Sequence, residues 1–392
     1  MTTAEPMRTA LRPAAPGAKL KILYIQPGTR LFAGIERVID SVCTELVNQY
    51  GTEFDVDVLY TSSHQNFPAD ARKYNRILRE APTPLSRIFT YRRLIQRGNY
   101  DLVVVPQIEP MAFCWLACIG LNCRFALHLH GNPAHERTRL KARIMFFIAE
   151  ACVLRRIPYI FGTSPAQIDA FKDRYELKAE MRWLPNPVRS FGALQRRGEE
   201  PARPTTFVNV GRFDHQKGQD ILIGAFAKLY RRQPNVRLKL VGHGGDEPAL
   251  RAQIERLKLN AVVDIEYHPT DPHAALAASD IYVSTSRWEG WSLVICEALR
   301  FGLPVIAVDC DFGPRDILVD TRLGRLVPPR DEDALVDAMS AYHDNLHHER
   351  AFSRYRQDYV DRFSLENVVH LHADALRSAA RSEQGAGRPA CR

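Results

Sequence analysis

Two cationic side chains stand in a short polar segment that follows an apolar run. Arg212 and Lys217 belong to Asn209-Val-Gly-Arg-Phe-Asp-His-Gln-Lys-Gly218, where a strand pattern ends at Gly211 and a helical pattern begins near Gln219. An arginine can grip a diphosphate with two hydrogen bonds, a lysine adds a point charge, and a helix N-terminus favours anions. The segment is a candidate phosphate site, and a solvated basic turn is the ordinary alternative.

Two glutamates eight residues apart follow a later strand pattern, in Glu289-Gly-Trp-Ser-Leu-Val-Ile-Cys-Glu297. Ser292 stands near the N-cap of the predicted helix, and the spacing of a little over two turns lets both carboxylates point the same way. Glu297 has apolar neighbours, so it needs hydrogen-bond donors, which sugar hydroxyls would supply. The alternative is a pair of glutamates stabilised only by the helix dipole.

A histidine ends a predicted strand in the first half of the chain. His130 lies in Leu129-His-Gly131, so we expect it to face a ligand cleft. His128 is two residues earlier and shares its strand face. A buried core histidine is the ordinary alternative for both, and we prefer it for His128.

Strand patterns that alternate with helical patterns must position these residues, and they predict parallel sheets covered by helices on both faces. A chain of 392 residues exceeds the roughly 250–300 residues of a single core. The polar stretch 190–204 lacks periodicity and is the predicted linker, after which the alternation restarts. We therefore expect two doubly wound α/β domains that face each other across a cleft, with ligands at the carboxyl ends of the strands. The expected segments are a flexible tail at 1–18, a first domain at 19–189, a linker at 190–204, a second domain at 205–360, a helix at 361–381 that can return to the first domain, and a flexible tail at 382–392.

Composition and charge exclude several classes of protein. The formal net charge of +8 favours anionic partners such as phosphates, acidic lipids or nucleic acid. No base-stacking motif or zinc finger supports a nucleic-acid binder, and no G-x-G-x-x-G turn supports a dinucleotide oxidoreductase. Cys114, Cys118 and Cys123 lie in an apolar stretch, which predicts buried, reduced thiols rather than a zinc site. That stretch is well short of the ~20 residues of a membrane helix.

Two Asp-x-Asp pairs have the spacing of a metal site found in another class of transferase. Asp55 and Asp57 lie within a strand pattern and are predicted to be alternating surface residues, whereas Asp309 and Asp311 end a strand. We expect neither pair to hold a metal.

Taken together, these motifs resemble the retaining GT-B glycosyltransferases of family 4, also called group 1. The resemblance rests on the Gly-Arg…Lys-Gly loop and the Glu-x7-Glu segment, in that order. It is supported by three further segments, which are Asn186-Pro-Val188, Val241-Gly-His-Gly-Gly245 and Gly302-Leu-Pro-Val-Ile306. It covers the C-terminal half nearly throughout and the N-terminal half at scattered points.

The resemblance implies a GT-B fold, with an N-terminal Rossmann-like acceptor domain and a C-terminal Rossmann-like donor domain. It also implies a role for each matching residue. Ala33-Gly-Ile-Glu-Arg-Val38 resembles the family's Gly-Gly-x-Glu-Arg turn, in which Gly34 lets the chain approach the donor phosphate; Ala33 departs from the first glycine, and a plain turn glycine is the alternative. The implied catalytic residues are His130 and Glu289, and the implied donor-binding residues are Gly34, Gly211, Arg212, Lys217, Gly244, Gly290, Trp291, Ser292, Leu293 and Glu297.

The expected activity is transfer of a hexose from a nucleotide-diphosphate sugar, with retention of configuration and without a metal or other cofactor. Residues 312–317 resemble those of members that use UDP-hexoses, although Asp316 stands where Glu is more usual. The expected acceptor is a glycan or lipid-linked molecule in surface polysaccharide, lipopolysaccharide or glycolipid synthesis. The alternative is a catalytically inactive GT-B module that binds a nucleotide sugar. No nucleic-acid partner is expected.

Two basic segments also contain interleaved apolar residues. One is Arg87–Arg97, and the other runs from Arg137 through Arg139, Lys141 and Arg143 into Ile144–Ile148. Such helices can lie on anionic lipid, and an ordinary solvated helix face is the alternative. The expected location is the cytoplasm, with peripheral attachment to the inner face of the cytoplasmic membrane as an option.

Overall fold

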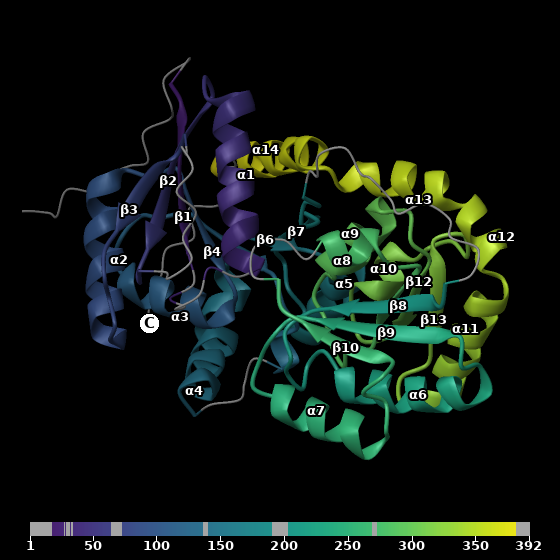
Figure 1. Ribbon diagram of the computed structural model, residues 1–392. Helices are drawn as coiled ribbons and strands as arrows, with labels where there is room; N and C mark the ends of the chain where they lie inside the picture. Colours follow the sequence, from purple (N-terminus) through teal and green to yellow (C-terminus); the bar gives the residue numbers. More distant parts are fainter. Residues whose placement is uncertain are drawn as a thin grey trace, which may run out of the picture. The chain divides into compact units, whose positions relative to one another are not determined.

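The computed structural model describes residues 18–26, 28, 32, 34–63, 73–135, 140–189, 203–268 and 273–381. These residues form two compact units (Figure 1). The first unit contains the described residues within Met1–Thr163, Ile168–Leu184 and Val368–Arg392, and the second contains those within Ser164–Gln167 and Pro185–Asn367.

The first unit is built on a seven-stranded sheet in which every neighbouring pair is parallel, in the order β3-β2-β1-β4-β5-β6-β7. The strand order runs outward in both directions from β1 and β4, so the topological switch point lies between these two strands. The strands are β1 (Leu20–Ile25), β2 (Phe54–Tyr60), β3 (Asn75–Leu78), β4 (Leu102–Pro106), β5 (Phe125–Leu129), β6 (Tyr159–Gly162) and β7 (Glu180–Trp183).

Helices cover both faces of this sheet, which explains why its central strands are almost wholly apolar. Val103 and Val105 of β4 face one core with α2, α3 and α4, whereas Leu102 and Val104 face a second core with α1 and α14. The helices are α1 (Gly34–Tyr50), α2 (Pro84–Gly98), α3 (Ile108–Ala117), α4 (Leu140–Ile148), α5 (Pro165–Tyr175) and α14 (Leu365–Arg381). Short helical turns lie at Pro133–His135, Ala149–Val153, which is a π-helix, and Leu154–Arg156.

The second unit repeats this design with six parallel strands in the order β10-β9-β8-β11-β12-β13, which places its switch point between β8 and β11. The strands are β8 (Thr205–Val210), β9 (Val236–Val241), β10 (Val263–Glu266), β11 (Ile281–Ser284), β12 (Val305–Val308) and β13 (Gly324–Val327). The helices are α6 (Gln219–Arg232), α7 (Glu247–Arg256), α8 (His273–Ala277), α9 (Leu293–Arg300), α10 (Pro314–Ile317), α11 (Glu332–Asp344), α12 (Leu346–Ala351) and α13 (Ser353–Val360), followed by a 3-10 turn at Asp361–Phe363. One core packs against α6, α7 and α11, and the other against α9 and α13.

The predicted fold class, two doubly wound parallel sheets, is confirmed. Three strands that the sequence patterns did not predict are β3, β7 and β13. Each has four residues, includes an arginine, and lies at an edge of its sheet. Edge strands contact the core less completely, so they do not need the continuous apolar run that identifies a central strand.

One prediction about β2 was wrong. Asp57 was expected on the surface, but it is only 4% exposed. Its carboxylate accepts hydrogen bonds from the Tyr100 hydroxyl at 2.5 Å and the Asn75 amide at 2.8 Å. These partners come from distant segments, so strand alternation alone could not reveal them.

The C-terminal helix was predicted at 361–381, and α14 begins at Leu365 and belongs to the first unit from Val368 onward. Residues 1–17 and 382–392, and 190–202 of the predicted linker, lie outside the described residues. None of the described helices has the length and apolarity needed to cross a bilayer.

Candidate donor and catalytic site

Most of the predicted site residues of the second unit lie on the loops that follow β8 and β11, whereas Gly244 follows β9, and Leu293 and Glu297 are part of α9. Strands β8 and β11 are neighbours at the switch point, and the carboxyl ends of parallel strands meet at one edge of the sheet. The segments 211–218 and 285–292, far apart in sequence, are therefore brought together.

A glycine allows the two loops to touch. Gly218 has φ +64, and a Cβ built on it would lie 2.2 Å from the carbonyl oxygen of Thr285. The Thr285 hydroxyl donates a hydrogen bond to the Gly218 carbonyl at 2.8 Å. Nearby, Arg287 forms an ion pair with Asp220 at 2.6 Å. No side chain fits at position 218, so the glycine fixes the spacing of the two loops.

The contact between these loops carries an ion pair. The Lys217 ammonium donates to Glu289 Oε1 at 2.6 Å, and the Ser286 hydroxyl donates to the same oxygen at 2.7 Å. Glu289 is 5% exposed. The predicted phosphate-binding cation and the predicted sugar-binding acid thus neutralise each other in this structure, and one carboxylate oxygen is held by two donors.

The predicted geometry of the two glutamates needs correction. Ser292 is the N-cap of α9, as predicted, and the helix begins at Leu293. Glu289 lies three residues before the N-cap, so the helical spacing used to align it with Glu297 does not apply. Glu289 is therefore on the preceding loop, where Lys217 and Ser286 set its orientation rather than helical spacing.

Glu297 is on the buried side of α9 and is 4% exposed. Two cationic or titratable side chains approach its Oε1, namely Arg189 Nε at 3.7 Å and His273 Nε2 at 3.9 Å. Sequence reasoning found neither residue, because each comes from a segment distant from Glu297. Both carboxylates also contribute, after burial, to raising the pKa of the Tyr282 hydroxyl well above its ordinary value.

Arg212 occupies a different environment from Lys217. Its side chain is 65% exposed and forms an ion pair with Asp214 at 3.0 Å. It also donates to the Gln216 side chain at 3.2 Å. The two predicted cations therefore lie on one loop, but only Lys217 is held at the contact with the loop after β11.

The turn at the start of α9 packs against two other segments. Trp291 is 5% exposed, and its indole packs edge-on against Phe363 with centroids 5.1 Å apart. Ser292 makes no side-chain cap to the first turn of α9. Gly313, with φ +89, places a third loop against this turn, since a Cβ there would lie 3.3 Å from the Ser292 nitrogen. Donor contacts through the amides of Gly290–Leu293 stay a prediction.

The second glycine turn packs against the first loop. A Cβ on Gly244 would lie 2.2 Å from the Phe213 carbonyl oxygen, so the missing side chain is needed for this contact. The Phe213 amide donates to the His243 carbonyl at 2.9 Å. Gly211 also contacts the Lys217 stem, 3.4 Å from its Cβ position. Gln219, which sequence reasoning missed, donates to the Arg212 carbonyl at 3.0 Å and secures the loop.

In the first unit, Gly34 is the first residue of α1, and a Cβ there would meet nothing within 4 Å among the described atoms. The space beside Gly34 therefore permits the close approach that the resemblance implies, without requiring it. Ala33 lies outside the described residues.

His130 follows β5 and is 7% exposed, within a group of three histidine rings. The His128 ring lies 4.0 Å from the His130 ring and 5.6 Å from that of His372, a residue of α14 that sequence reasoning missed. Burial, followed by the neighbouring His130, lowers the pKa of His372 to about 3. The same two causes also lower the pKa of the His128 imidazole well below its ordinary value, with a further contribution from His372.

Asp309, of the second Asp-x-Asp pair, forms a two-pronged ion pair with Arg315 at 2.9 and 2.8 Å. Within the described part of the chain, no group of three or more His, Cys, Asp or Glu side chains is arranged to hold a metal ion.

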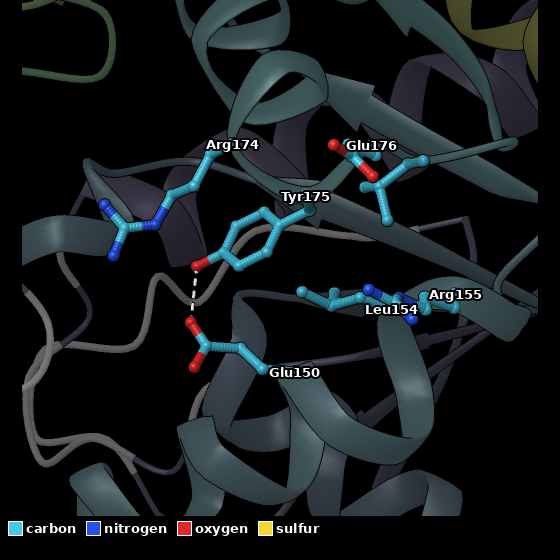
Figure 2. A pocket seen from close by; sticks show the side chains of 7 residues that line it. Glu150, Leu154, Arg155, Arg174, Tyr175 and Glu176 are labelled. Atoms are coloured by element: carbon cyan, nitrogen blue, oxygen red, sulfur yellow. Dashed lines mark hydrogen bonds between the residues drawn. The ribbon is translucent and has the colours of Figure 1, made fainter.

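The first unit also contains a pocket of about 570 Å³ (Figure 2). It is lined by Glu150, Leu154 and Arg155 and by residues 174–177 at and after the C-terminal end of α5, and the Tyr175 hydroxyl donates to Glu150 at 2.6 Å. Because α5 follows β6, its C-terminal end returns to the amino edge of the sheet, opposite the edge where ligands bind in this fold. The pocket is not part of the candidate site.

Comparisons with known proteins agree on one family. Residues 32–190 match the model for Glycosyltransferase Family 4, and residues 191–358 match the model for Glycosyl transferases group 1. An uncharacterized glycosyltransferase of Methanocaldococcus jannaschii is 34% identical over 251 residues, which cover 60% of this chain and 62% of the relative. The phosphatidyl-myo-inositol mannosyltransferase of Mycobacterium tuberculosis is 32% identical over 170 residues, which cover 41% of this chain and 44% of the relative.

Both matches span less than two thirds of these relatives' own length. Among solved structures, the lipopolysaccharide outer core galactosyltransferase WaaB superposes with a TM-score of 0.71 at 19% identity, covering 92% of this chain and 99% of the other. That likeness supports the GT-B fold alone.

Proposed function

The chain is a group 1 glycosyltransferase of family 4 with the GT-B fold, and from this premise we propose that it transfers a hexose from a UDP-sugar with retention of configuration. The observation that carries the proposal is the ion pair between Lys217, whose side chain is 20% exposed, and the buried Glu289, which joins the loops that follow β8 and β11. It holds a cation and a carboxylate together where a diphosphate and its sugar would bind in such a sheet.

Charge gives each residue a role. Cleavage of the anomeric bond leaves negative charge on the diphosphate and positive character on the sugar. Lys217 and the amides at the start of α9 would stabilise the diphosphate, with Arg212 contributing from the surface. When Lys217 turns to the phosphate, Glu289 remains hydrogen-bonded to Ser286 and can accept hydrogen bonds from the sugar hydroxyls. Glu297 would bind the ribose.

Retention fits front-face attack, in which the acceptor oxygen attacks on the side from which the diphosphate leaves. The departing phosphate then takes the acceptor's proton. We assign His130 a catalytic role, because it directly follows β5 at the edge of the sheet where ligands bind in this fold. In this proposal no metal takes part, since Lys217 and the helix amides supply the compensating charge.

The proposed acceptor is a glycan or a lipid-linked molecule of surface polysaccharide or glycolipid synthesis. One relative is named for transfer of mannose to a phosphatidyl-inositol, which is a membrane lipid. We propose that the enzyme works in the cytoplasm, as a peripheral protein on the inner face of the cytoplasmic membrane, and that it has no nucleic-acid partner.

A screen of donor hydrolysis tests the proposal. UDP-, GDP- and ADP-sugars are incubated with the full chain, with and without EDTA, and release of the nucleotide and the sugar anomer is measured. Turnover of a UDP-hexose that EDTA leaves unchanged is the expected result. Loss of activity in EDTA would contradict metal independence. Saturable binding of a UDP-sugar with no turnover, with or without a glycan or lipid-linked acceptor, would instead indicate the inactive binding module.

A further inference from the structure

The first unit exposes large apolar side chains on two helices. Leu85 and Phe89 of α2 are each 69% exposed, and Leu140 and Phe147 of α4 are 73% and 70% exposed. No other large hydrophobic side chain among the described residues is exposed to this degree, the next being Val319 at 63%. Concentrated apolar exposure of this kind marks an interaction surface.

On α2 the exposed apolar residues share one stripe. Leu85, Phe89 and Arg93 are spaced by four residues, so they follow one another along the same face of the helix. Tyr91 and Ile95 are buried on the opposite side, in the core of the unit. The stripe is therefore not needed to attach α2 to its own sheet.

The same division holds on α4. Leu140, Ile144 and Phe147 follow one face at spacings of four and three residues, with Ile144 48% exposed. Ala142 and Phe146 are buried on the other face. The helix thus has one apolar face in the core and a second apolar face in contact with solvent.

The two helices lie in one region, since both pack against α3 (Figure 1). Arg92 of α2 donates to the carbonyls of Ala117 and Ile119 at the end of α3, at 2.9 Å each. Ile119 is itself 37% exposed. We call the exposed faces of α2 and α4 the α2–α4 surface.

Charge identifies the kind of partner. The sequence of α2 contains four arginines and no acidic residue, and that of α4 contains Lys141 and Arg143 and no acidic residue. Arg93, Arg97 and Arg143 are exposed beside the apolar stripes. Apolar side chains flanked by cations match the interface of an anionic bilayer, where the former enter the acyl boundary and the latter meet phosphates.

We propose that the α2–α4 surface docks the protein on an anionic phospholipid bilayer. The inference rests on the proposed function, whose membrane-bound acceptor it would bring within reach, but its physical basis is independent of catalysis. A second copy of this chain is a poor occupant, because two surfaces with the same positive charge repel each other.

The test is co-sedimentation of the purified full chain with vesicles, without donor or acceptor. Vesicles of phosphatidylcholine alone are compared with vesicles that also contain phosphatidylglycerol. We expect binding only to the anionic vesicles, weakened by salt. Failure of the wild-type chain to bind them overturns the proposal.

Matched substitutions locate the binding surface. Leu85→Ser with Phe89→Ser, and Ile144→Ser with Phe147→Ser, should each lower vesicle binding about tenfold or more. Replacing Arg93, Arg97 and Arg143 with Gln should weaken binding and flatten its dependence on salt. Val319→Ser removes a comparably exposed apolar side chain in the second unit and should bind as the wild type does. Wild-type binding by both serine pairs would refute the surface.

Two readouts separate this inference from the proposed function. Donor hydrolysis without vesicles should be unchanged in the serine variants, because no residue of the α2–α4 surface belongs to the candidate site. Vesicle binding by a chain that hydrolyses no nucleotide sugar would support the surface while the function fails. Sedimentation velocity in which the wild type dimerises and the Leu85→Ser/Phe89→Ser variant does not would assign the surface to a second copy and overturn the proposal.

Discussion

The loops at the carboxyl edges of the two sheets are held by different kinds of contact. In the second unit, loops from neighbouring strands are joined by ion pairs and close backbone contacts, of which Lys217–Glu289 and Gly218–Thr285 are central. In the first unit, the end of β5 carries histidine rings packed against one another and against α14. The comparison teaches that the second unit holds a charged pair in place at this edge, whereas burial and neighbouring rings in the first unit lower the pKa of His128 and His372 and favour their neutral forms.

The largest effect should come from breaking the ion pair. Glu289→Ala and Lys217→Ala should each lower kcat/KM for donor turnover ~10²-fold or more, as expected when a transition-state contact is lost. Steady-state kinetics measure this. Lys228→Ala is the matched control, because Lys228 is paired with acids on the surface and should change the rate by less than about twofold. Near-normal activity in both site variants would refute the assignment.

A second effect tests the contact between the loops. Gly218→Ala places a Cβ where the Thr285 carbonyl lies 2.2 Å away, at a φ that side chains rarely adopt, so the loops must separate. We expect the Tm to fall by about 3 °C or more and the donor KM to rise about tenfold. Gly245→Ala is the control, since its Cβ would meet nothing within 4 Å. Equal behaviour of the two variants would show that the loops are not held in this way.

The third prediction concerns the neutral histidines of the first unit. The pKa of His372 is lowered to about 3 in the folded state, so its stabilisation is complete above the ordinary value of about 6.5 and is lost as the pH falls below it. Lowering the pH from 7.5 to 5.5 should therefore reduce the free energy of unfolding by about 1.4 kcal/mol through this histidine.

Urea unfolding at the two pH values measures that loss, and His372→Gln should reduce it. His347→Gln, at an exposed position, should leave the pH dependence as it is in the wild type. A pH dependence that His372→Gln does not alter would mean that His372 is already charged, or solvated, in the folded protein.

The smallest effect is expected at Arg212. Its side chain is 65% exposed and already paired with Asp214, so its contribution to donor binding is screened by water. Arg212→Ala should raise the donor KM about threefold to tenfold with little change in kcat. A loss as large as that of Lys217→Ala would show that Arg212 turns inward when the donor binds, which would erase the difference between the two cations.

The central strands and the site loops could be predicted from sequence because their signals are local. A buried strand followed by Gly211, two cations and the start of α6 is one continuous segment, and α6 begins at Gln219 as expected. The three edge strands were not predicted, because each has only four residues, including a charged one, and so shows no clear apolar pattern.

The partners of the site residues could not be predicted, because they come from distant parts of the chain. Arg189 and His273 approach Glu297, and His372 joins His128, only through the fold. Helical spacing was also wrongly applied to Glu289, which lies before the N-cap that the sequence correctly placed at Ser292, so its orientation depends on contacts with Lys217 and Ser286. Local patterns identify which residues carry the chemistry, and tertiary contacts decide how each is charged and held.

The position of α14 has a consequence for how the protein is made. Val369, Ala373 and Leu376 fill the core on one face of the first sheet, yet they are synthesised after the whole of the second unit. On the ribosome, that face has α1 but not α14 to cover it while the later unit is free to fold. The unit that is translated first is thus the last whose core can be completed. A chain that ends just before α14 would have a folded second unit and a first unit with an incomplete core.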